Sequence, residues 1–171
     1  MSNQSSTTLD YLKKFLKEIT SQDIILTKIN FDTFKENVFL FYTLKEKPQL
    51  DREWNINEIR VEIGNLILNN NSKVPIITIN YVVNYKDFFI HNKSKKLITS
   101  IRLIYTIRII LKENSFFETL SESEQKNIID NFADSTGKLI IIPYIRHIID
   151  FLSRLAGTPV LPLPPVMIKD K

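Results

Sequence analysis

The stretch PYIRHIIDFLSRLAGTPVLPLPPV, residues 143–166, joins an amphipathic helix to a segment that cannot be helical. Gly157 stands where a C-terminal helix cap is expected, with Pro159 just beyond it. From there to Val166 prolines alternate with apolar residues, which predicts an extended strap whose side chains rest on the protein. The buried helix face is predicted from residues at helical spacing: Ile145, Ile148, Ile149, Leu152 and Leu155.

Upstream, the pattern predicts an N-terminal helix and then four strands. Residues 1–20 hold a polar start and an amphipathic helix, with Thr7 or Thr8 as its N-cap. Alternating residues in 23–112 predict strands. Their segments are 25–33, 58–63, 77–85 and 97–112. The buried faces of the third and fourth are predicted from Ile77, Ile79, Tyr81, Val83, Tyr85, Leu97, Ile101, Leu103, Tyr105, Ile107, Ile109 and Leu111.

Helices are predicted over residues 121–156. Ser121 and Glu124 have the spacing of a capping box, and Asp134–Gly137 is expected to break the chain before the long helix. Short polar connections favour antiparallel strands, and strands followed by helices indicate an α+β fold. The expectation is one domain over residues 1–171: a four-stranded antiparallel sheet packed by C-terminal helices, an extra N-terminal helix and a Pro-rich tail, 157–171.

Composition and motifs give little support for catalysis. The chain has 171 residues, no cysteine and a formal charge of +4. His91 and His147 lack metal-ligand spacing, and the three glycines are isolated, so we expect no metal, no cofactor and no enzyme activity. The start lacks the features of a signal peptide, and no apolar run is long enough to span a membrane, so we expect a cytoplasmic protein.

Three groups of side chains are candidates for binding. The basic cluster Lys93–Lys96 is expected to be a solvated loop, with a nucleic-acid contact as the alternative. The aromatic residues are either ordinary core or a groove that receives client polypeptide. Residues on the second face of the fourth strand need a cover, which predicts an oligomer interface. The client-binding candidates are Phe31, Phe34, Phe39, Phe41, Tyr42, Phe88 and Phe89. The interface candidates are Ile98, Ile104 and Ile110.

The C-terminal stretch resembles the signature of the SecB family of protein-export chaperones. The match runs from the Pro-Tyr-x-Arg start of a long helix, through a Gly/Thr turn, to a Leu-x-Leu-x-Pro-Val tail, without a gap. Upstream, Trp54 and the segment 58–63 look like a second family segment, with one extra residue and no proline. The motif residues are Pro143, Tyr144, Arg146, Gly157, Leu161, Leu163 and Pro165.

The resemblance implies a holdase, a chaperone that binds non-native polypeptides without ATP, built as a homotetramer that is a dimer of dimers. The chain departs from the export branch in three ways: it is basic, it ends five residues after Val166, and it has an additional N-terminal helix. Docking on the SecA motor is therefore in doubt. These departures resemble SecB-like chaperones of toxin–antitoxin–chaperone systems, which protect an antitoxin. A binding module that is not a chaperone, for nucleic acid or a protein partner, is the alternative.

Overall fold

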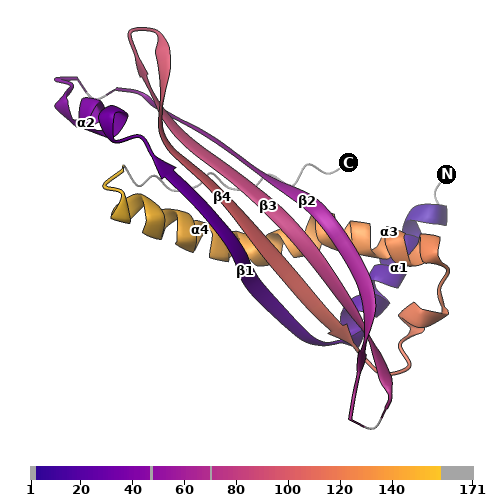
Figure 1. Ribbon diagram of the computed structural model, residues 1–171. Coiled ribbons are helices and arrows are strands. Elements are labelled where there is room, and N and C mark those ends of the chain that lie inside the picture. Colours follow the sequence, from indigo (N-terminus) through magenta and orange to yellow (C-terminus); the bar gives the residue numbers. More distant parts are fainter. Residues whose placement is uncertain (1–2, 47, 70, 159–171) are drawn as a thin grey trace. The chain divides into compact units, whose positions relative to one another are not determined.

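The computed structural model describes residues 3–46, 48–69 and 71–158, without the side chains of residues 3–9, 58 and 59. Leu161, Leu163, Pro165 and the predicted strap therefore lie outside the described residues. Four strands form one sheet in the order β1-β4-β3-β2, with helices before and after them (Figure 1). The predicted α+β class, with its four-stranded antiparallel sheet and extra N-terminal helix, is confirmed.

The elements before the C-terminal helices are longer than predicted. The helix α1 begins at Asn3, so neither predicted N-cap threonine stands at its start. The predicted helix reached residue 20, but Ile19 is already the first residue of the strand β1. An additional helix, α2, occupies what the sequence predicted as a loop. The bounds are α1 Asn3–Glu18, β1 Ile19–Thr33, α2 Lys35–Thr43, β2 Leu50–Ile67, β3 Lys73–His91 and β4 Ser94–Leu111.

The C-terminal helices run together instead of separating at the predicted break. The elements are η1 Phe116–Thr119, α3 Glu122–Phe132, the π-helical turn η2 Ala133–Gly137 and α4 Lys138–Leu155. The backbone stays helical from α3 through η2 into α4. Thus α4 begins at Lys138, and Pro143 lies inside the helix.

Turn and cap chemistry agree with the sequence patterns. Ser121 and Glu124 form the predicted capping box. Gly157 has a φ of 64°, and its amide donates to the Arg154 carbonyl while the Thr158 amide donates to the Ser153 carbonyl, which is a Schellman motif. Asn92 and Lys93 both have positive φ, as a tight hairpin between β3 and β4 requires.

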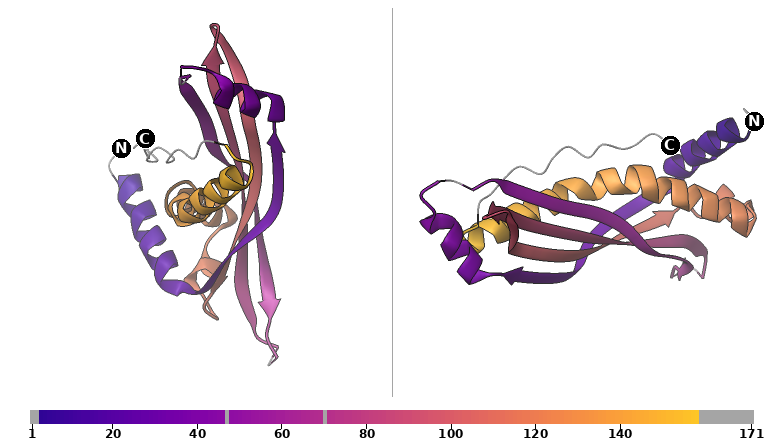
Figure 2. Two further views of the ribbon diagram at one scale, coloured as in Figure 1. Left: turned by 90° about the vertical axis from the view of Figure 1, so that its left-hand side faces the viewer. Right: turned by 90° about the horizontal axis from the view of Figure 1, so that it is seen from above.

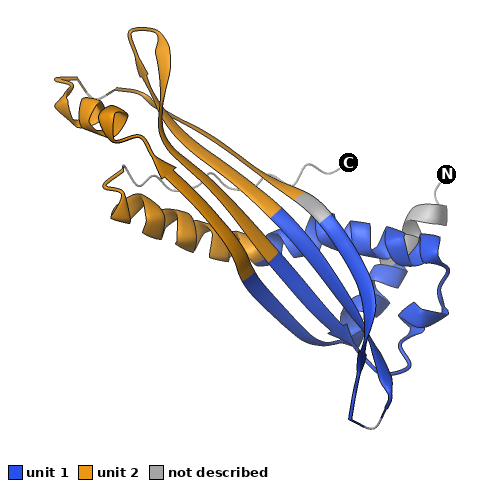
Figure 3. Ribbon diagram, in the orientation of Figure 1, with its two compact units in different colours: residues 1–25, 58–81, 106–140 blue, residues 26–57, 82–105, 141–171 orange. Residues whose placement is uncertain are grey.

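The chain divides into two compact units, which Figure 3 colours separately. Unit 1 comprises residues 1–25, 58–81 and 106–140, and unit 2 comprises residues 26–57, 82–105 and 141–171. The prediction of a single domain stays a prediction.

In unit 1, α1 lies against α3 (Figure 2). The Phe15 ring is fully buried and lies 5.6 Å from the Phe132 ring and 5.7 Å from the Phe117 ring, between ring centres. The core also holds the predicted faces of β3 and β4, which are confirmed at Ile77, Ile79, Tyr81, Ile107, Ile109 and Leu111. Each such side chain contributes roughly 1.5–3 kcal/mol when fully buried.

In unit 2, the buried residues of α4 are Ile141, Ile142, Ile145, Ile149 and Ser153. The predicted faces of β3 and β4 are confirmed here at Val83, Tyr85, Ile101, Leu103 and Tyr105. Leu155, predicted to face the core, is 68% exposed, so that prediction is wrong. Ser153, near the end of the helix, is buried, and its backbone carbonyl accepts the hydrogen bond of the Thr158 amide.

Candidate peptide-binding surface

The helix α2 forms because residues 35–43 cap themselves with backbone groups and contain no helix breaker. The Asn37 and Val38 amides donate to the Phe34 carbonyl at 2.9 and 3.0 Å, which closes the first turn. At the other end Leu44 is extended, and the Thr43 hydroxyl donates to the Leu40 carbonyl. No side chain of α2 is buried. A helix this short therefore depends on contacts outside itself.

Three contacts within unit 2 hold α2 in place. The Phe34 amide donates to the Ile98 carbonyl at 2.9 Å, and the Asn37 side-chain amide donates to the Leu97 carbonyl at 2.7 Å. The Phe41 ring packs edge-on against the buried Phe89 ring, with 5.8 Å between ring centres. These contacts anchor one side of α2 and leave its other side open.

The open side of α2 is aromatic. Phe39 is 72% exposed and Tyr42 is 60% exposed, and their spacing of three residues puts them on one face. The Tyr42 hydroxyl donates to the Gly157 carbonyl at 2.8 Å, so this face is tied to the C-cap of α4. Phe34, at the N-cap, is also exposed. We call Phe34, Phe39 and Tyr42 the aromatic face.

The other predicted client-binding residues are less exposed to solvent. Phe31, Phe41 and Phe88 are half-buried. Phe89 is fully buried in the core, which contradicts its predicted role as a client contact. Its burial follows from strand alternation, because Phe89 shares the inner face of β3 with Tyr85. Phe89 instead supports α2 from below through the Phe41 ring.

A second exposed apolar stripe lies on α4 and was missed by the sequence analysis. Tyr144, Phe151 and Leu155 are each at least half exposed, and Ile148, which was predicted to be buried, is half-buried between them. Their spacing of three and four residues places them on one side of the helix. The sequence signal was available, since Ile141, Ile145 and Ile149 already form a buried face on an adjacent side of the helix.

The predicted oligomer-interface set on β4 divides in two. Ile98 is fully buried within its own chain, so it has no surface for a partner and its predicted role is wrong. Ile104 and Ile110 are half-buried and keep some surface. Alternation alone placed Ile98 on the outer face, but the Phe34 amide bonds to its carbonyl, which brings the chain entering α2 to this point.

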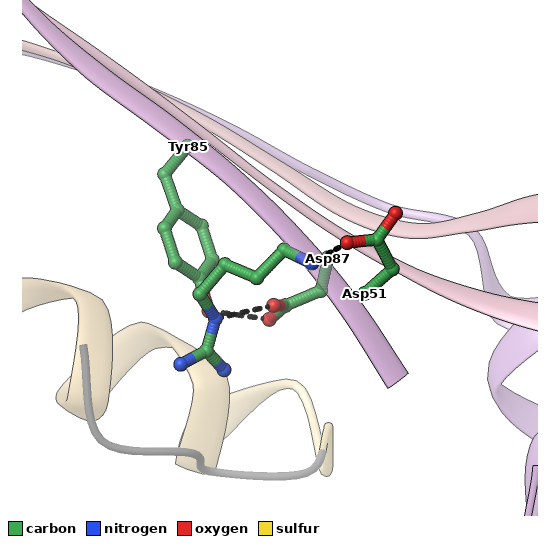
Figure 4. A network of polar contacts seen from close by, with 4 residues as sticks. Asp51, Tyr85 and Asp87 are labelled. Atoms are coloured by element: carbon green, nitrogen blue, oxygen red, sulfur yellow. Dashed lines mark hydrogen bonds and ion pairs between the residues drawn. The ribbon is translucent and has the colours of Figure 1, made fainter. Parts of the chain in front are cut away.

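Unit 2 also contains a buried polar network between β2 and β3 (Figure 4). Arg52 Nε lies 2.9 Å from Asp87 Oδ1, and the Tyr85 hydroxyl donates to Asp87 Oδ2 at 2.6 Å. The Arg52 guanidinium also lies over the Tyr85 ring, 5.3 Å from its centre. Burial, and then the charge of Asp87, raise the pKa of Tyr85 far above its usual value. Tyr85 is therefore a permanent donor that holds Asp87, which is a structural role.

The basic hairpin between β3 and β4 carries less free charge than its sequence suggests. Lys95 pairs with Asp51 at 2.7 Å and with Glu53, and its ammonium lies 4.3 Å from the centre of the Phe88 ring. The hydrogen bond that Lys95 donates to the Asp51 carboxylate is the main cause that raises the pKa of Lys95, so the lysine stays charged but paired. This pairing weakens the case for nucleic-acid binding at Lys93–Lys96.

Within the part of the chain that the structure describes, no group of three or more His, Cys, Asp or Glu side chains is placed to hold a metal ion. Over the same residues, no helix is long and apolar enough to cross a membrane. His147 is exposed on α4, as a surface histidine would be.

Comparison with known proteins adds evidence about the fold. No family model and no curated protein matches the chain. Nine chains of solved structures match it. One of them is the Mycobacterium tuberculosis Rv1957 SecB-like chaperone, in complex with a ChAD peptide from the Rv1956 HigA1 antitoxin. The match has a TM-score of 0.57 and 12% identity and covers 90% of this chain and 94% of that chain. The chain therefore has a fold similar to that of a SecB-like chaperone.

Proposed function

We propose that the protein is an ATP-independent holdase that binds non-native polypeptides and keeps them soluble. The observation that carries this proposal is the aromatic face of α2. Phe39 and Tyr42 are mostly exposed although α2 is anchored to unit 2 by hydrogen bonds and ring contacts. Leaving large aromatic groups in water costs free energy, so a fixed, open aromatic face is best explained as a site for a partner.

The chemistry of this face suits unfolded chains. Aromatic side chains supply a large contact area and lose little rotamer freedom on binding, which favours loose recognition of many apolar segments. A chaperone of this kind needs no nucleotide, because binding and release follow from the client's own folding. The exposed stripe on α4 adds further apolar area in the same unit. Many weak contacts along a client can then combine into useful affinity.

We infer two alternative settings for the holdase, in each case in the cytoplasm and as a homotetramer. The first is protection of an antitoxin in a toxin–antitoxin–chaperone system, which is supported by the SecB-like chaperone of similar fold that was solved with an antitoxin peptide. The second is protein export with handover to the SecA motor. The formal charge of +4 favours the first setting, since the family docks on SecA partly through acidic residues.

The test is suppression of aggregation of a chemically unfolded client, measured by light scattering without ATP. The double variant Phe39→Ser/Tyr42→Ser should need about tenfold more protein to protect the client, because two aromatic anchors are lost. Its thermal unfolding should stay close to that of the wild-type protein, since neither side chain is buried and the Tyr42–Gly157 hydrogen bond that is lost is exposed to solvent. The matched control is Leu139→Ser, which removes a half-exposed apolar side chain in unit 1 and should protect normally.

Two results would refute this assignment. If the double variant protects the client as well as the control does, the aromatic face is not the binding site. If the wild-type protein fails to suppress aggregation of any client at a molar excess, the holdase function itself is wrong. Raising the salt concentration is an independent check, because apolar binding persists while charge-driven binding weakens.

A further inference from the structure

Positive charge is concentrated in unit 2, the unit that contains the aromatic face. Its described residues include eleven lysines and arginines and seven aspartates and glutamates, whereas those of unit 1 include nine and eleven. The formal charge of +4 is thus not spread evenly over the chain. A client that approaches the aromatic face encounters a positive potential, which attracts acidic segments and repels basic ones.

Ion pairs within unit 2 neutralise most of its acidic side chains and few of its basic ones. The pairs are Asp51 and Glu53 with Lys95, Asp87 with Arg52, and Asp150 with Arg154. Among the described residues of the unit, eight basic side chains then have no acidic partner, and all but Lys96 of them are exposed. These eight are Lys28, Lys35, Lys45, Lys86, Lys93, Lys96, Arg102 and Arg146. The unpaired acidic residues are Asp32, Glu36 and Glu46.

One of these lysines, Lys35, shares the side of α2 that carries the exposed rings. It precedes Phe39 by four residues and Tyr42 by seven, so the helical repeat places it in line with both. The exposed Glu36 lies three residues before Phe39 but six before Tyr42, so it flanks only one of the rings. The Lys35 ammonium can therefore reach a client group beside either ring, and the positive charge dominates between them.

The stability of α2 does not require a lysine at this position. Lys35 is the first residue of the helix, where the helix macrodipole favours negative side chains and disfavours positive ones. Its side chain is exposed and has no ion-pair partner among the described residues. A positive charge that weakens the helix and pairs with nothing in unit 2 is best explained by a partner that it contacts.

We propose that the aromatic face selects client segments in which an aromatic residue is accompanied by an acidic one, with Lys35 as the specificity-determining residue. This inference rests on the proposed holdase function and names the class of its clients. In an extended client, side chains two residues apart point to the same side and lie about 6–7 Å apart. This distance is similar to the spacing of about 5–6 Å between residues one turn apart on a helix. A carboxylate two residues from a client ring that lies on Phe39 therefore reaches Lys35.

Fluorescence anisotropy with labelled peptides tests the preference. Three peptides of equal length contain the same phenylalanines, each followed at the second position by aspartate, asparagine or lysine. At low salt the aspartate peptide should bind about threefold to fivefold more tightly than the asparagine peptide, which is the effect of an exposed ion pair, and the lysine peptide should bind most weakly. Added salt should bring all three affinities close to that of the asparagine peptide, because it screens charges and leaves apolar contacts in place.

Charge variants assign the preference to Lys35. Lys35→Glu should weaken binding of the aspartate peptide by about fivefold and strengthen binding of the lysine peptide. Binding of the asparagine peptide should stay unchanged, because both rings remain, and this result also shows that α2 is intact. The matched control is Lys126→Glu, which changes an exposed lysine of α3 in unit 1 and should leave the order of the three peptides as in the wild-type protein.

The failure of this proposal can be distinguished from the failure of the holdase proposal. Equal binding of the three peptides to the wild-type protein, or a preference that Lys35→Glu changes no more than Lys126→Glu does, would overturn the selection of acidic clients. The holdase proposal would still stand if Phe39→Ser/Tyr42→Ser lost all three peptides, and it would fail if the wild-type protein bound none of them. A single-stranded RNA that displaces the aspartate peptide and binds the double variant with wild-type affinity would make the basic surface a nucleic-acid site, which also overturns the proposal.

Discussion

Two buried tyrosines illustrate how residues of one type can have opposite effects on stability. Tyr81 and Tyr105 are each at most 2% exposed and lie on the inner faces of β3 and β4. The Tyr81 hydroxyl donates to the Ala133 carbonyl at 3.0 Å. The Tyr105 hydroxyl has no hydrogen-bond partner among the described residues, and its burial raises its pKa to about 12. The first hydroxyl is satisfied, and the second carries a desolvation cost.

We therefore predict that the same substitution gives different results at these positions. Tyr81→Phe should lower the free energy of unfolding by about 1–2 kcal/mol, because it removes a buried hydrogen bond. Tyr105→Phe should leave it unchanged or raise it by up to about 1 kcal/mol, because it removes an unsatisfied buried polar group. Urea unfolding of both variants measures the difference. A loss at Tyr105 equal to that at Tyr81 would show that the Tyr105 hydroxyl has a partner.

At this scale, the predicted inner-face residues of β3 and β4 are all buried except Leu97, which is half-buried. Strand alternation failed at Ile98, which was placed on the outer face and is fully buried, and at Phe89, an inward aromatic residue that was taken for a surface one. Both failures have one cause. Alternation describes a strand alone, whereas burial also depends on what the rest of the chain brings to that strand.

Among the elements, the π-helical turn η2 joins α3 to α4 without breaking the helical backbone. A π turn has wider hydrogen bonds than an α-helix and is rare, so the residues that pack against it are of interest.

Gly137 and Tyr81 fit together at this turn. A Cβ atom on Gly137 would lie 2.1 Å from the Tyr81 hydroxyl oxygen, far closer than atoms can approach. Gly137→Ala should therefore lower the free energy of unfolding by about 1–3 kcal/mol. Gly64→Ala, whose Cβ would meet its nearest neighbour at 3.6 Å, is the control and should have little effect.

A double-mutant cycle makes this prediction specific. The atom behind the hydroxyl, Tyr81 Cζ, would lie 3.2 Å from the new Cβ, so removing the hydroxyl relieves most of the overlap. Tyr81→Phe should therefore recover part of the stability lost in Gly137→Ala, measured by chemical unfolding of all four proteins. Strictly additive losses would mean that the hydroxyl and Gly137 do not interact.

The sequence predicted the caps at the ends of helices better than the points at which a helix breaks or continues. The capping box at Ser121 and the glycine cap at Gly157 were predicted because each needs only local residues in fixed spacing. The turn at Asp134–Gly137 was misread as a break. Its residues favour turns, but the chain stays helical, and Tyr81, far away in the sequence, packs against Gly137. The aromatic helix α2 was missed for a related reason, since its anchors lie on β3 and β4.

For the whole molecule, chain connectivity predicts that the two units unfold together. Residues of β1, β2, β3, β4 and α4 belong to both units, so neither unit can lose its strands without disturbing the other. The chain has one tryptophan, Trp54, which lies half-buried on β2 in unit 2 and reports on that unit alone. Gly137→Ala, by contrast, perturbs unit 1. The two positions allow one unit to be disturbed while the other is observed.

Gly137→Ala should therefore lower the midpoint of the Trp54 fluorescence transition by as much as it lowers that of the far-ultraviolet circular dichroism transition. Coincident transitions seen by two probes are the signature of two-state unfolding. A loss of about 1–3 kcal/mol corresponds to several degrees in a chain of this size, so the shift is measurable. If the dichroism signal falls early while the Trp54 signal keeps its wild-type midpoint, the units unfold independently. The aromatic face in unit 2 would then survive partial unfolding of unit 1, and client protection should persist at that temperature.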